Sequence, residues 1–323
     1  MGGGVLLRTA TGDERPGRQN RRAGRVGSRD GRLAPPIDVL THPALARLHP
    51  TVGHPESPER LEVLLRAFPD ARQGRAAERS ALERVHAPEY LDVLATLSGP
   101  HWFDADTVAS ETSWTAALLA AGTAIEAAET SGFALVRPPG HHARPRTAMG
   151  FCLVNNVAVA ARHMQAEHGM ERVAIVDYDL HHGNGTQEIF WEDDTVLFVS
   201  LHAWPFYPGT GGPTEQSDTT VNVPLSTESG DEEYLLAFDS VVIPAVERFG
   251  PDLLLVSAGF DAHEEDPYRQ MRVTDEGVRE LSRRCAALAP RVAAVLEGGY
   301  NVATLPRLVS AALEGFSENA TAG

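Results

Sequence analysis

The chain has 323 residues, of which 42% are hydrophobic and 22% charged, so it is long enough to bury a large core within one domain. This composition excludes a disordered or fibrous protein over most of its length. The net charge of −16 is uneven, because residues 1–36 carry eight Arg against three acidic residues and the remainder is strongly acidic. An acidic body repels a phosphate backbone, which argues against direct nucleic-acid binding by the folded part, and it attracts cationic substrates.

Membrane proteins and disulfide-rich secreted proteins are further classes that the sequence disfavours. No apolar run approaches the ~20 residues that span a bilayer, and the N-terminus lacks the apolar core of a secretory signal. The only cysteines, Cys152 and Cys285, form neither a CxxC pair nor a disulfide framework. We therefore expect a cytoplasmic protein, and the sequence leaves its oligomeric state open.

Residues 1–36 differ from the rest of the chain in being rich in Gly and Arg and poor in large apolar side chains. Such a segment cannot bury enough apolar surface to order itself, so we expect a disordered basic tail. Basic tails can bind nucleic acid, but a tail without a function of its own is the simpler interpretation. The catalytic domain is then expected over residues 37–323.

Helical and strand patterns alternate along this second part. Continuous apolar runs predict buried strands at residues 133–137, 172–178, 196–201, 253–257 and 292–296. Helices are predicted from Ser57, with Pro58 at the first position, and over residues 113–130, 154–168, 231–249 and 274–288. Gly169 is expected to end the third helix and Pro244 to bend the fourth. Helices between apolar strands predict an α/β domain with a mainly parallel sheet covered on both faces.

Polar clusters rich in His, Asp and Tyr follow five of the predicted strands. In chain order they are Arg137–His142, Asp177–Gly185, Ser200–His202, Ser257–Asp261 and Glu297–Asn301. The carboxyl ends of parallel strands lie at one edge of a sheet, where α/β proteins bind their ligands. The sequence therefore predicts one site built from five loops.

Asp179 and His181 stand two residues apart at the end of a strand, so in extended geometry both side chains point to the same side and can hold one metal ion. Asp261 can complete a three-ligand site from another loop. Two Asp and one His leave positions open for water and substrate, as in catalytic zinc sites. The competing interpretation is a strand end with solvated polar residues.

His141 and His142 are adjacent in a turn fixed by Pro and Gly. One imidazole can act as a general base towards a water molecule and then as an acid towards a leaving amine. Tyr300 follows two glycines that permit a tight turn, and it can donate a hydrogen bond to a developing oxyanion. Taken singly, the histidines could be a surface pair and Tyr300 a half-buried aromatic anchor.

Six motifs together resemble those of the zinc-dependent histone deacetylase family. They are Arg137-Pro-Pro-Gly-His-His-Ala143, Gly150-Phe-Cys-Leu-Val-Asn-Asn156, Asp177-Tyr-Asp-Leu-His-His-Gly-Asn-Gly-Thr-Gln187, Tyr207-Pro-Gly-Thr-Gly211, Ser257-Ala-Gly-Phe-Asp-Ala262 and Leu296-Glu-Gly-Gly-Tyr-Asn301. The match starts at about His54, and its variants are similar to class II members and bacterial histone deacetylase-like amidohydrolases. It implies a single-domain, arginase/deacetylase-like, three-layer α/β/α fold.

The resemblance implies a role for each catalytic residue. Asp179, His181 and Asp261 would bind zinc. His142 would be the main general base and acid, and Tyr300 would polarise the scissile carbonyl.

The resemblance also implies roles for His141 and for two residues beside the histidines. His141 would act as an electrostatic partner oriented by Asp177, and Asn184 would be the partner of His142. Many class I members have an Asp where Asn184 stands, so His142 should be less basic here.

The resemblance also implies a substrate tunnel and a second ion. Phe151 and Tyr207, with Gly150 beside them, match the positions that wall the tunnel for the methylene stem of acetyl-lysine. A structural potassium or similar monovalent ion is implied at Asp177, Asp179, His181, Ser200 and Leu201.

The activity implied is that of a zinc-dependent amidohydrolase, which removes acetyl or other short acyl groups from lysine-like amines and releases acetate. Its substrates would be acetyl-lysine peptides or small acetylated amines. An acetylpolyamine deacetylase is the close alternative, favoured by the acidic body. Polyamine-specific relatives, however, have Glu after an Asp-Pro pair, whereas Tyr268 follows Asp266-Pro267 here. A catalytically silent acyl-group binder is disfavoured, because the zinc ligands, His142 and Tyr300 are all present.

Residues outside these motifs receive other interpretations. Glu265 stands where the arginase metal motif has a second Asp, so two-manganese chemistry is not expected. His263 and Glu264 are interpreted as rim residues. Residues 101–113 and 209–220 are expected to shape the rim of the site.

Overall fold

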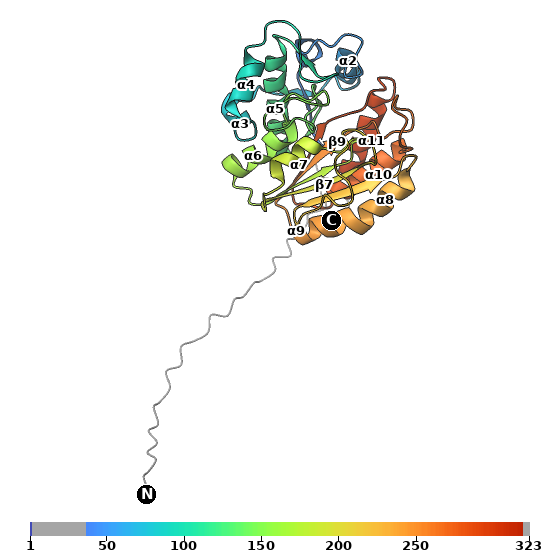
Figure 1. Cartoon of the computed structure of the whole chain (residues 1–323). Coiled ribbons are helices and arrows are strands. Elements are labelled where there is room, and N and C mark those ends of the chain that lie inside the picture. Colours follow the sequence, from blue (N-terminus) through green and yellow to red (C-terminus); the bar gives the residue numbers. More distant parts are fainter. Residues whose placement is uncertain (2–36, 319–323) are drawn as a thin grey trace. The chain divides into compact units, whose positions relative to one another are not determined.

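A parallel sheet of eight strands lies at the centre of the described part of the chain, which comprises Met1 and residues 37–318 of this computed structural model (Figure 1). Every neighbouring pair is parallel, in the order β2-β1-β5-β10-β9-β6-β7-β8. The strands are β1 (Val39–Thr41), β2 (Arg72–Gln73), β5 (Phe133–Ala134), β6 (Val173–Asp177), β7 (Val196–Ala203), β8 (Thr220–Leu225), β9 (Leu253–Ala258) and β10 (Val292–Leu296). The predicted α/β class and mainly parallel sheet are confirmed. The expected disordered tail falls, apart from Met1, outside the described residues.

Helices cover both faces of the sheet (Figure 1). α5 (Ser113–Thr130) and α6 (Asn156–His168) pack against each other, and α10 (Asp275–Ala286) packs against α11 (Leu305–Glu318) and α8 (Asp231–Ala237). The connection through α6 runs from β5 to β6, whereas the connection through α10 runs from β9 to β10 in the opposite direction along the sheet. Right-handed crossovers therefore place α6 and α10 on opposite faces. Because both faces are covered, every residue of β6, β7 and β9 is buried.

The remaining elements are short and lie mainly near the N-terminal part of the domain. They are α1 (Leu45–Leu48), α2 (Pro58–Ala67), α3 (Arg79–Leu82), α4 (Pro88–Ala95), α7 (Asn184–Phe190), α9 (Ile243–Phe249) and the antiparallel pair β3 (His101–Trp102) and β4 (Val108–Ala109). Sequence patterns did not predict the helices α1, α3, α4, α7 and α11 or the strands β1, β2, β3, β4 and β8. β8 alternates polar and apolar residues and contains Pro224, which an edge strand tolerates because one side of its backbone needs no partner.

Helix boundaries agree with the predicted ones to within a few residues. Pro58 is the first residue of α2, but the Ser57 side chain makes no capping hydrogen bond. α6 begins at residue 156 instead of 154, because the Asn155 side chain accepts the hydrogen bond of the Ala158 amide and caps the helix there. Gly169 ends it in the left-handed conformation, at a φ of 64°.

The predicted helix over residues 231–249 is divided. α8 continues into a π-helical turn, η1 (Phe238–Val242), before α9. Pro244 has no amide hydrogen, and its ring would crowd the carbonyl of Ser240 in a regular α-helix. The wider turn, in which the Ile243 amide donates to the Phe238 carbonyl, accommodates this, so a π turn replaces the simple bend that was predicted.

The first predicted strand is shorter than expected, since β5 ends at Ala134 although residues 135–137 are also buried. Pro138 and Pro139 follow, and neither can donate to a strand ladder. The apolar run therefore predicted burial correctly but predicted a strand that is too long.

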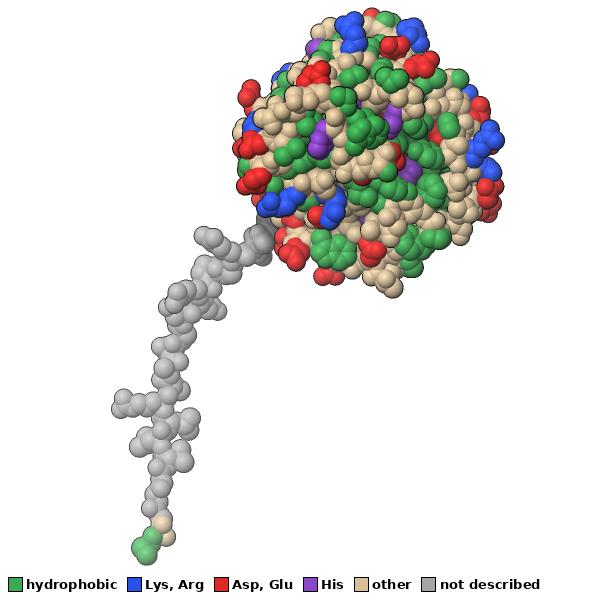
Figure 2. Space-filling view, turned by 45° about the horizontal axis from the view of Figure 1, so that its top comes forward, with side chains coloured by type: hydrophobic (Ala, Val, Ile, Leu, Met, Phe, Trp, Pro, Cys, Tyr) green, Lys and Arg blue, Asp and Glu red, His purple; other side chains and the backbone are tan. Residues whose placement is uncertain are grey.

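The charged surface side chains and the unpaired cysteines agree with what the composition predicted. On the face visible in Figure 2, acidic and Arg side chains alternate around the periphery, and hydrophobic and His side chains gather towards the middle. Cys152 and Cys285 are both free and buried. Within residues 37–318, no helix has the length and hydrophobicity that a membrane crossing requires.

Candidate active site

The five predicted polar clusters follow five neighbouring strands. β5, β10, β9, β6 and β7 are consecutive in the sheet, and one cluster begins near the carboxyl end of each. Parallel strands end at the same edge, so residues far apart in sequence meet in one group of loops.

Asp179, His181 and Asp261 form a buried cluster at this edge. The His181 Nδ1 atom lies 3.1 Å from Asp179 Oδ1 and 3.1 Å from Asp261 Oδ2. Nδ1 hydrogen-bonds Asp179, and Asp261 Oδ2 is left buried without a hydrogen-bond partner among the described residues. An orphaned buried carboxylate oxygen beside an imidazole nitrogen and a second carboxylate is a set of atoms suited to bind a metal ion.

The separations in this cluster fit a zinc ion. Ligand atoms around a tetrahedral Zn²⁺, at roughly 2.0–2.2 Å from the metal, lie roughly 3.3–3.6 Å from one another. Both 3.1 Å separations are close to that range. The backbone fixes the carboxylates, because the Gly298 amide donates to Asp179 Oδ2 at 2.8 Å and the Leu180 amide to Asp261 Oδ1 at 2.9 Å.

Two glycines leave room for these carboxylates. A Cβ on Gly259 would lie 2.0 Å from Asp179 Oδ2, and one on Gly298 would lie 2.2 Å from Asp261 Oδ2. Both distances are far below van der Waals contact, so no larger residue fits without moving the ligand set.

The charge of the cluster also suits a cation. Burial alone would lower the pKa of His181, but the carboxylates of Asp179 and Asp261 raise it to about 9. Burial and the nearby Asp179 raise the pKa of Asp261. Two carboxylates held together away from water thus require a compensating positive charge.

The adjacent histidines differ in their electrostatic surroundings. His141 Nδ1 lies 2.9 Å from Asp177 Oδ2, and His142 Nδ1 lies 2.7 Å from Asn184 Oδ1. Burial favours neutral His141, but the Asp177 and Asp179 carboxylates raise its pKa to about 10. Burial and the neighbouring His141 cation lower the pKa of His142 well below its usual value.

The hydrogen bond between His142 and Asn184 determines which ring nitrogen of His142 carries the hydrogen. The amide oxygen of Asn184 only accepts, so His142 Nδ1 carries the hydrogen and Nε2 is the basic nitrogen. His142 is therefore a neutral acceptor, whereas His141 is a cation held by a carboxylate.

Tyr300 lines the same cavity as His142 and His181. Burial raises the pKa of its phenol well above the usual value, so it remains a hydrogen-bond donor. Its amide donates to Asp266 Oδ2 at 2.8 Å, and the Tyr268 amide donates to Asp266 Oδ1 at 3.0 Å. One buried carboxylate thus fixes two loop segments that carry tyrosines.

A narrow cavity of about 160 Å³ connects these groups to the surface. It is lined by Asp106, His142, Gly150, Phe151, His181, Phe206, Tyr207, Tyr268 and Tyr300. The His181 ring stacks on Phe206, with ring centroids 5.4 Å apart, and Tyr207 meets the edge of His142 at 5.3 Å. The aromatic walls suit an apolar stem, and the ionisable groups meet its far end.

Comparison with known proteins identifies the family. Residues 54–316 match the family described as histone deacetylase domain. The chain belongs to the histone deacetylase family. It is 42% identical over 268 residues to a probable deacetylase of Archaeoglobus fulgidus, an alignment that covers 76% of this chain and 74% of that protein.

A plant member of the histone deacetylase family is similar in sequence, and a solved domain is similar in structure. Histone deacetylase 15 of Arabidopsis thaliana is 41% identical over 81% of this chain, which spans about half (52%) of that protein's length. A crystal structure of the HDA15 HD domain superposes with a TM-score of 0.82 at 38% identity, covering 87% of this chain and 90% of that one. The arginase/deacetylase fold is therefore confirmed.

In this histone deacetylase family member, the sequence-predicted site residues come together. The three predicted zinc ligands form the buried cluster, and His142, Gly150, Phe151, Tyr207 and Tyr300 line the cavity above it. His141, Asp177 and Asn184 lie directly behind it. Ser200 lies beside Asp177 in the β6–β7 register, and Leu201 is the next residue of β7.

Sequence reasoning missed three residues of the cavity wall. Phe206 directly precedes the predicted Tyr207, and Tyr268 entered the sequence argument only through the polyamine comparison. Asp106 lies in the segment 101–113, which was expected to shape the rim, but the residue itself was not predicted. No periodic pattern marks these positions, because they lie in loops.

Glu297 is a supporting residue that the sequence did not single out. Its Oε2 accepts hydrogen bonds from the amides of Gly140, at 2.6 Å, and His141, at 3.1 Å. Burial raises the pKa of the Glu297 carboxyl to about 7. It joins the loop after β10 to the histidine turn, and its place at the start of the Glu-Gly-Gly-Tyr motif was the available signal.

Arg60 is a second supporting residue. The buried guanidinium donates to the carbonyls of Gly299, at 2.7 Å, and Glu297, at 2.6 Å, and it pairs with Glu56. It also lies 5.0 Å from the centre of the Tyr300 ring. Arg60 therefore holds the backbone of the loop that carries Tyr300.

The interpretation of His263 as a rim residue was wrong. His263 was expected at the rim, but it is buried and its Nε2 lies 3.0 Å from Asp275 Oδ1 at the start of α10. Glu264, the adjacent residue, is exposed but does not line the cavity.

Proposed function

We propose that the protein is a zinc-dependent deacetylase, which hydrolyses the amide between an acetyl or other short acyl group and an amine on a lysine-like stem. The observation that carries this proposal is the position of the Asp179–His181–Asp261 cluster beside His142 and Tyr300 in one aromatic-walled cavity. The products would be acetate, or another short carboxylate, and the free amine.

Asp179, His181 and Asp261 would hold the zinc ion. Bound zinc would polarise the acyl carbonyl and increase the acidity of water at the site. The chain itself orients the ligands through the backbone amides of Gly298 and Leu180 and surrounds them with buried groups.

His142 would transfer the proton. Its Nε2 accepts a proton from the attacking water, and the resulting imidazolium donates that proton to the amine nitrogen as the C–N bond breaks. The Asn184 oxygen holds Nδ1–H throughout, which keeps the imidazole in the required tautomer. His141, paired with Asp177, holds a fixed positive charge behind it.

Tyr300 would stabilise the oxyanion that develops on the acyl oxygen. The phenol is protonated, lines the cavity and is held by the Asp266 carboxylate through its backbone. A donor fixed before the reaction pays no reorganisation cost when charge develops.

The cavity dimensions favour a lysine-like stem. A volume of about 160 Å³ walled by Phe151, Phe206 and Tyr207 admits an unbranched methylene chain and excludes bulky groups. Tyr268 lines this wall where polyamine-specific relatives carry Glu, which favours acyl-lysine over acetylpolyamine.

The proposal has two further parts, a monovalent-cation site and a cellular compartment. The neighbouring positions of Asp177 and Ser200 in the sheet support a monovalent-cation site built with Asp179, His181 and Leu201. The free, buried cysteines support a reducing cytoplasmic compartment.

Turnover of an acetyl-lysine peptide and of acetylspermidine by the zinc-reconstituted protein, measured side by side, tests the proposal. We expect faster hydrolysis of the peptide, with acetate as a product. Preference for acetylspermidine would instead support the polyamine alternative. Bound zinc without turnover of either substrate would favour the silent acyl-group binder.

Substitution of Gly298 tests the zinc ligands without changing any of them. In Gly298→Ala the new methyl group would lie 2.2 Å from Asp261 Oδ2 and 2.6 Å from Asp179 Oδ2, so at least one carboxylate must move. We expect loss of the tightly bound zinc, measured by metal analysis of the folded protein after dialysis. Gly230→Ala is the matched control, because its Cβ meets nothing closer than 3.2 Å. Equal zinc contents in the two variants would contradict the ligand assignment.

A further inference from the structure

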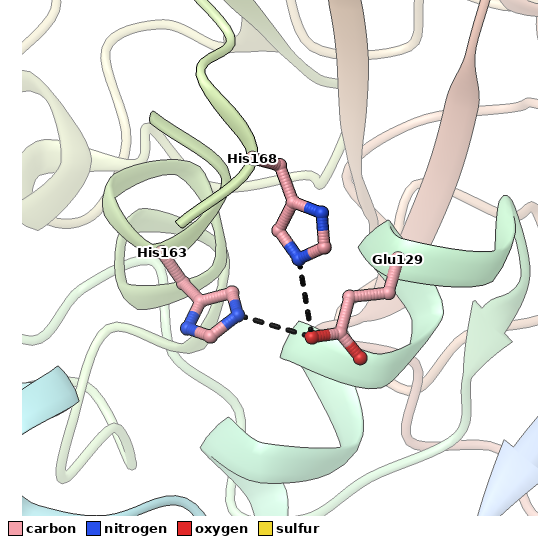
Figure 3. Close-up of side chains that lie close together, drawn as sticks. All are labelled: Glu129, His163 and His168. Carbon is pink, nitrogen blue, oxygen red and sulfur yellow. Dashed lines mark hydrogen bonds and ion pairs between the residues drawn. The ribbon is translucent and has the colours of Figure 1, made fainter. Parts of the chain in front are cut away.

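A second group of metal-ligating side chains lies at the ends of α5 and α6 (Figure 3). Glu129 is in the last turn of α5, and His163 and His168 are on α6, with His168 as its final residue. α5 precedes β5 and α6 precedes β6, so both helix ends lie near the amino ends of the strands. The catalytic groups follow the carboxyl ends, so this cluster is at the opposite edge of the sheet.

Both imidazoles point at one carboxylate oxygen (Figure 3). His163 Nε2 lies 3.0 Å from Glu129 Oε1, and His168 Nε2 lies 3.4 Å from the same atom. All three candidate ligand atoms lie within 4.8 Å of one another. The two nitrogen–oxygen separations are close to the roughly 3.3–3.6 Å between ligand atoms of tetrahedral zinc.

The burial of the three side chains suits a metal site with open positions. The exposed fraction is 16% for His163, 19% for Glu129 and 38% for His168, so the carboxylate and one imidazole are held and the second imidazole can adjust. Water can complete the coordination from the exposed side.

We propose that Glu129, His163 and His168 form a second site for a divalent metal ion that prefers imidazole and carboxylate ligands, such as Zn²⁺. In the absence of metal, one oxygen of Glu129 accepts from both imidazoles and from Arg75. A metal ion would take the place of the Nε2 hydrogens of His163 and His168. The Glu129 carboxylate would then bind both the metal ion and Arg75.

Arg75 is the group that competes with the metal. Its Nη2 lies 2.9 Å from Glu129 Oε1 and 2.8 Å from Oε2, and its side chain is 55% exposed. The guanidinium can move towards solvent, or it can keep its hydrogen bond to Glu129 Oε2 and give up the one to Oε1. Its charge weakens metal binding, so the site is expected to be weaker than the catalytic cluster and to be strengthened when Arg75 is removed.

The test is equilibrium dialysis of the full-length protein against Zn²⁺, with the bound metal quantified. Asp261→Asn serves as the background, because it disables the catalytic cluster and leaves the second site intact. We expect His168→Asn to lower the affinity of the remaining site at least about 10-fold, since loss of even an outer partner has that effect. We expect Arg75→Ala to raise it about twofold to fivefold, the scale of an exposed ion interaction.

His101→Asn is the control for general binding by surface imidazoles, because His101 is exposed and lies outside the cluster. His163→Asn, assayed in parallel, repeats the test at the more buried ligand, and thermal melting shows that each variant is folded. Zinc binding that is the same in the background, His168→Asn and Arg75→Ala proteins would overturn the proposal and leave the cluster as an ion-pair network.

Discussion

Tyr300→Phe is expected to lower kcat on an acetyl-lysine peptide about 10²- to 10³-fold, the effect of removing one oxyanion donor from an active site. No described residue hydrogen-bonds the Tyr300 hydroxyl, which lines the cavity, so its removal leaves no protein group without its partner. Zinc content and melting temperature should therefore remain at wild-type values. Steady-state kinetics with metal analysis of the same preparations would measure both.

Tyr268→Phe is the matched control for this experiment. Tyr268 lines the same cavity, and its ring lies 5.4 Å from that of Tyr300 in an edge-to-face contact. Phe keeps the ring and the wall of the tunnel, so we expect a much smaller loss of kcat than in Tyr300→Phe. Similar losses in the two variants would show that the phenols act on cavity shape or solvation, and not that Tyr300 is the oxyanion donor.

His142→Ala is expected to reduce kcat about 10²- to 10⁴-fold, which is the usual contribution of a general acid–base group. His142 is the histidine of the pair that lines the cavity, and it is the neutral one, because burial and the His141 cation lower its pKa. His42 does not line the cavity and provides a control, since His42→Ala should leave kcat near the wild-type value. A His142→Ala protein that is folded, binds zinc and retains full activity would refute this role.

The partner of His142 allows a sharper test of the same assignment through pH dependence. Asn184→Asp would place a carboxylate 2.7 Å from His142 Nδ1 and thereby raise the pKa of the imidazole. His142 must be neutral to accept a proton, so activity is lost as pH falls through its pKa. A raised pKa therefore moves the acidic limb of the kcat/KM profile to higher pH. An unchanged acidic limb would mean that another group controls it.

Several parts of the fold could be predicted because they depend on local pattern. The continuous apolar runs of β6, β7 and β9 indicate burial on both faces, and Gly169 marks the end of α6 by chemistry that operates within a few residues. The start of α6 was predicted two residues early, because the Asn155 cap was not recognised. β8 was missed because polar Thr220 and Asn222 interrupt its apolar run, it contains Pro224, and it lies at an edge. The π turn before Pro244 was missed because a proline shows where a helix is disturbed but not how the chain responds.

The candidate site, too, was predictable from the sequence only in part. The sequence placed Asp179 and His181 on one side of a strand end and proposed Asp261 as a third ligand from another loop. The approach of Asp261 Oδ2 to His181 Nδ1 depends on β6 and β9 being neighbours. The order of the strands in the sheet depends on the packing of the whole domain, so it cannot be predicted from a local sequence pattern.

The sequence by itself determined the α/β class, the family resemblance and the residue types at the strand ends, since these are written in short motifs and periodicities. Only the tertiary structure decided which loops meet, that Phe206 and Tyr268 complete the cavity wall, and that Glu297 and Arg60 hold the loop carrying Tyr300. It also brought Glu129 to His163 and His168, from two helices with no motif in common. Contacts between residues distant in the chain depend on the burial and packing of all the elements at once, and that information is not local.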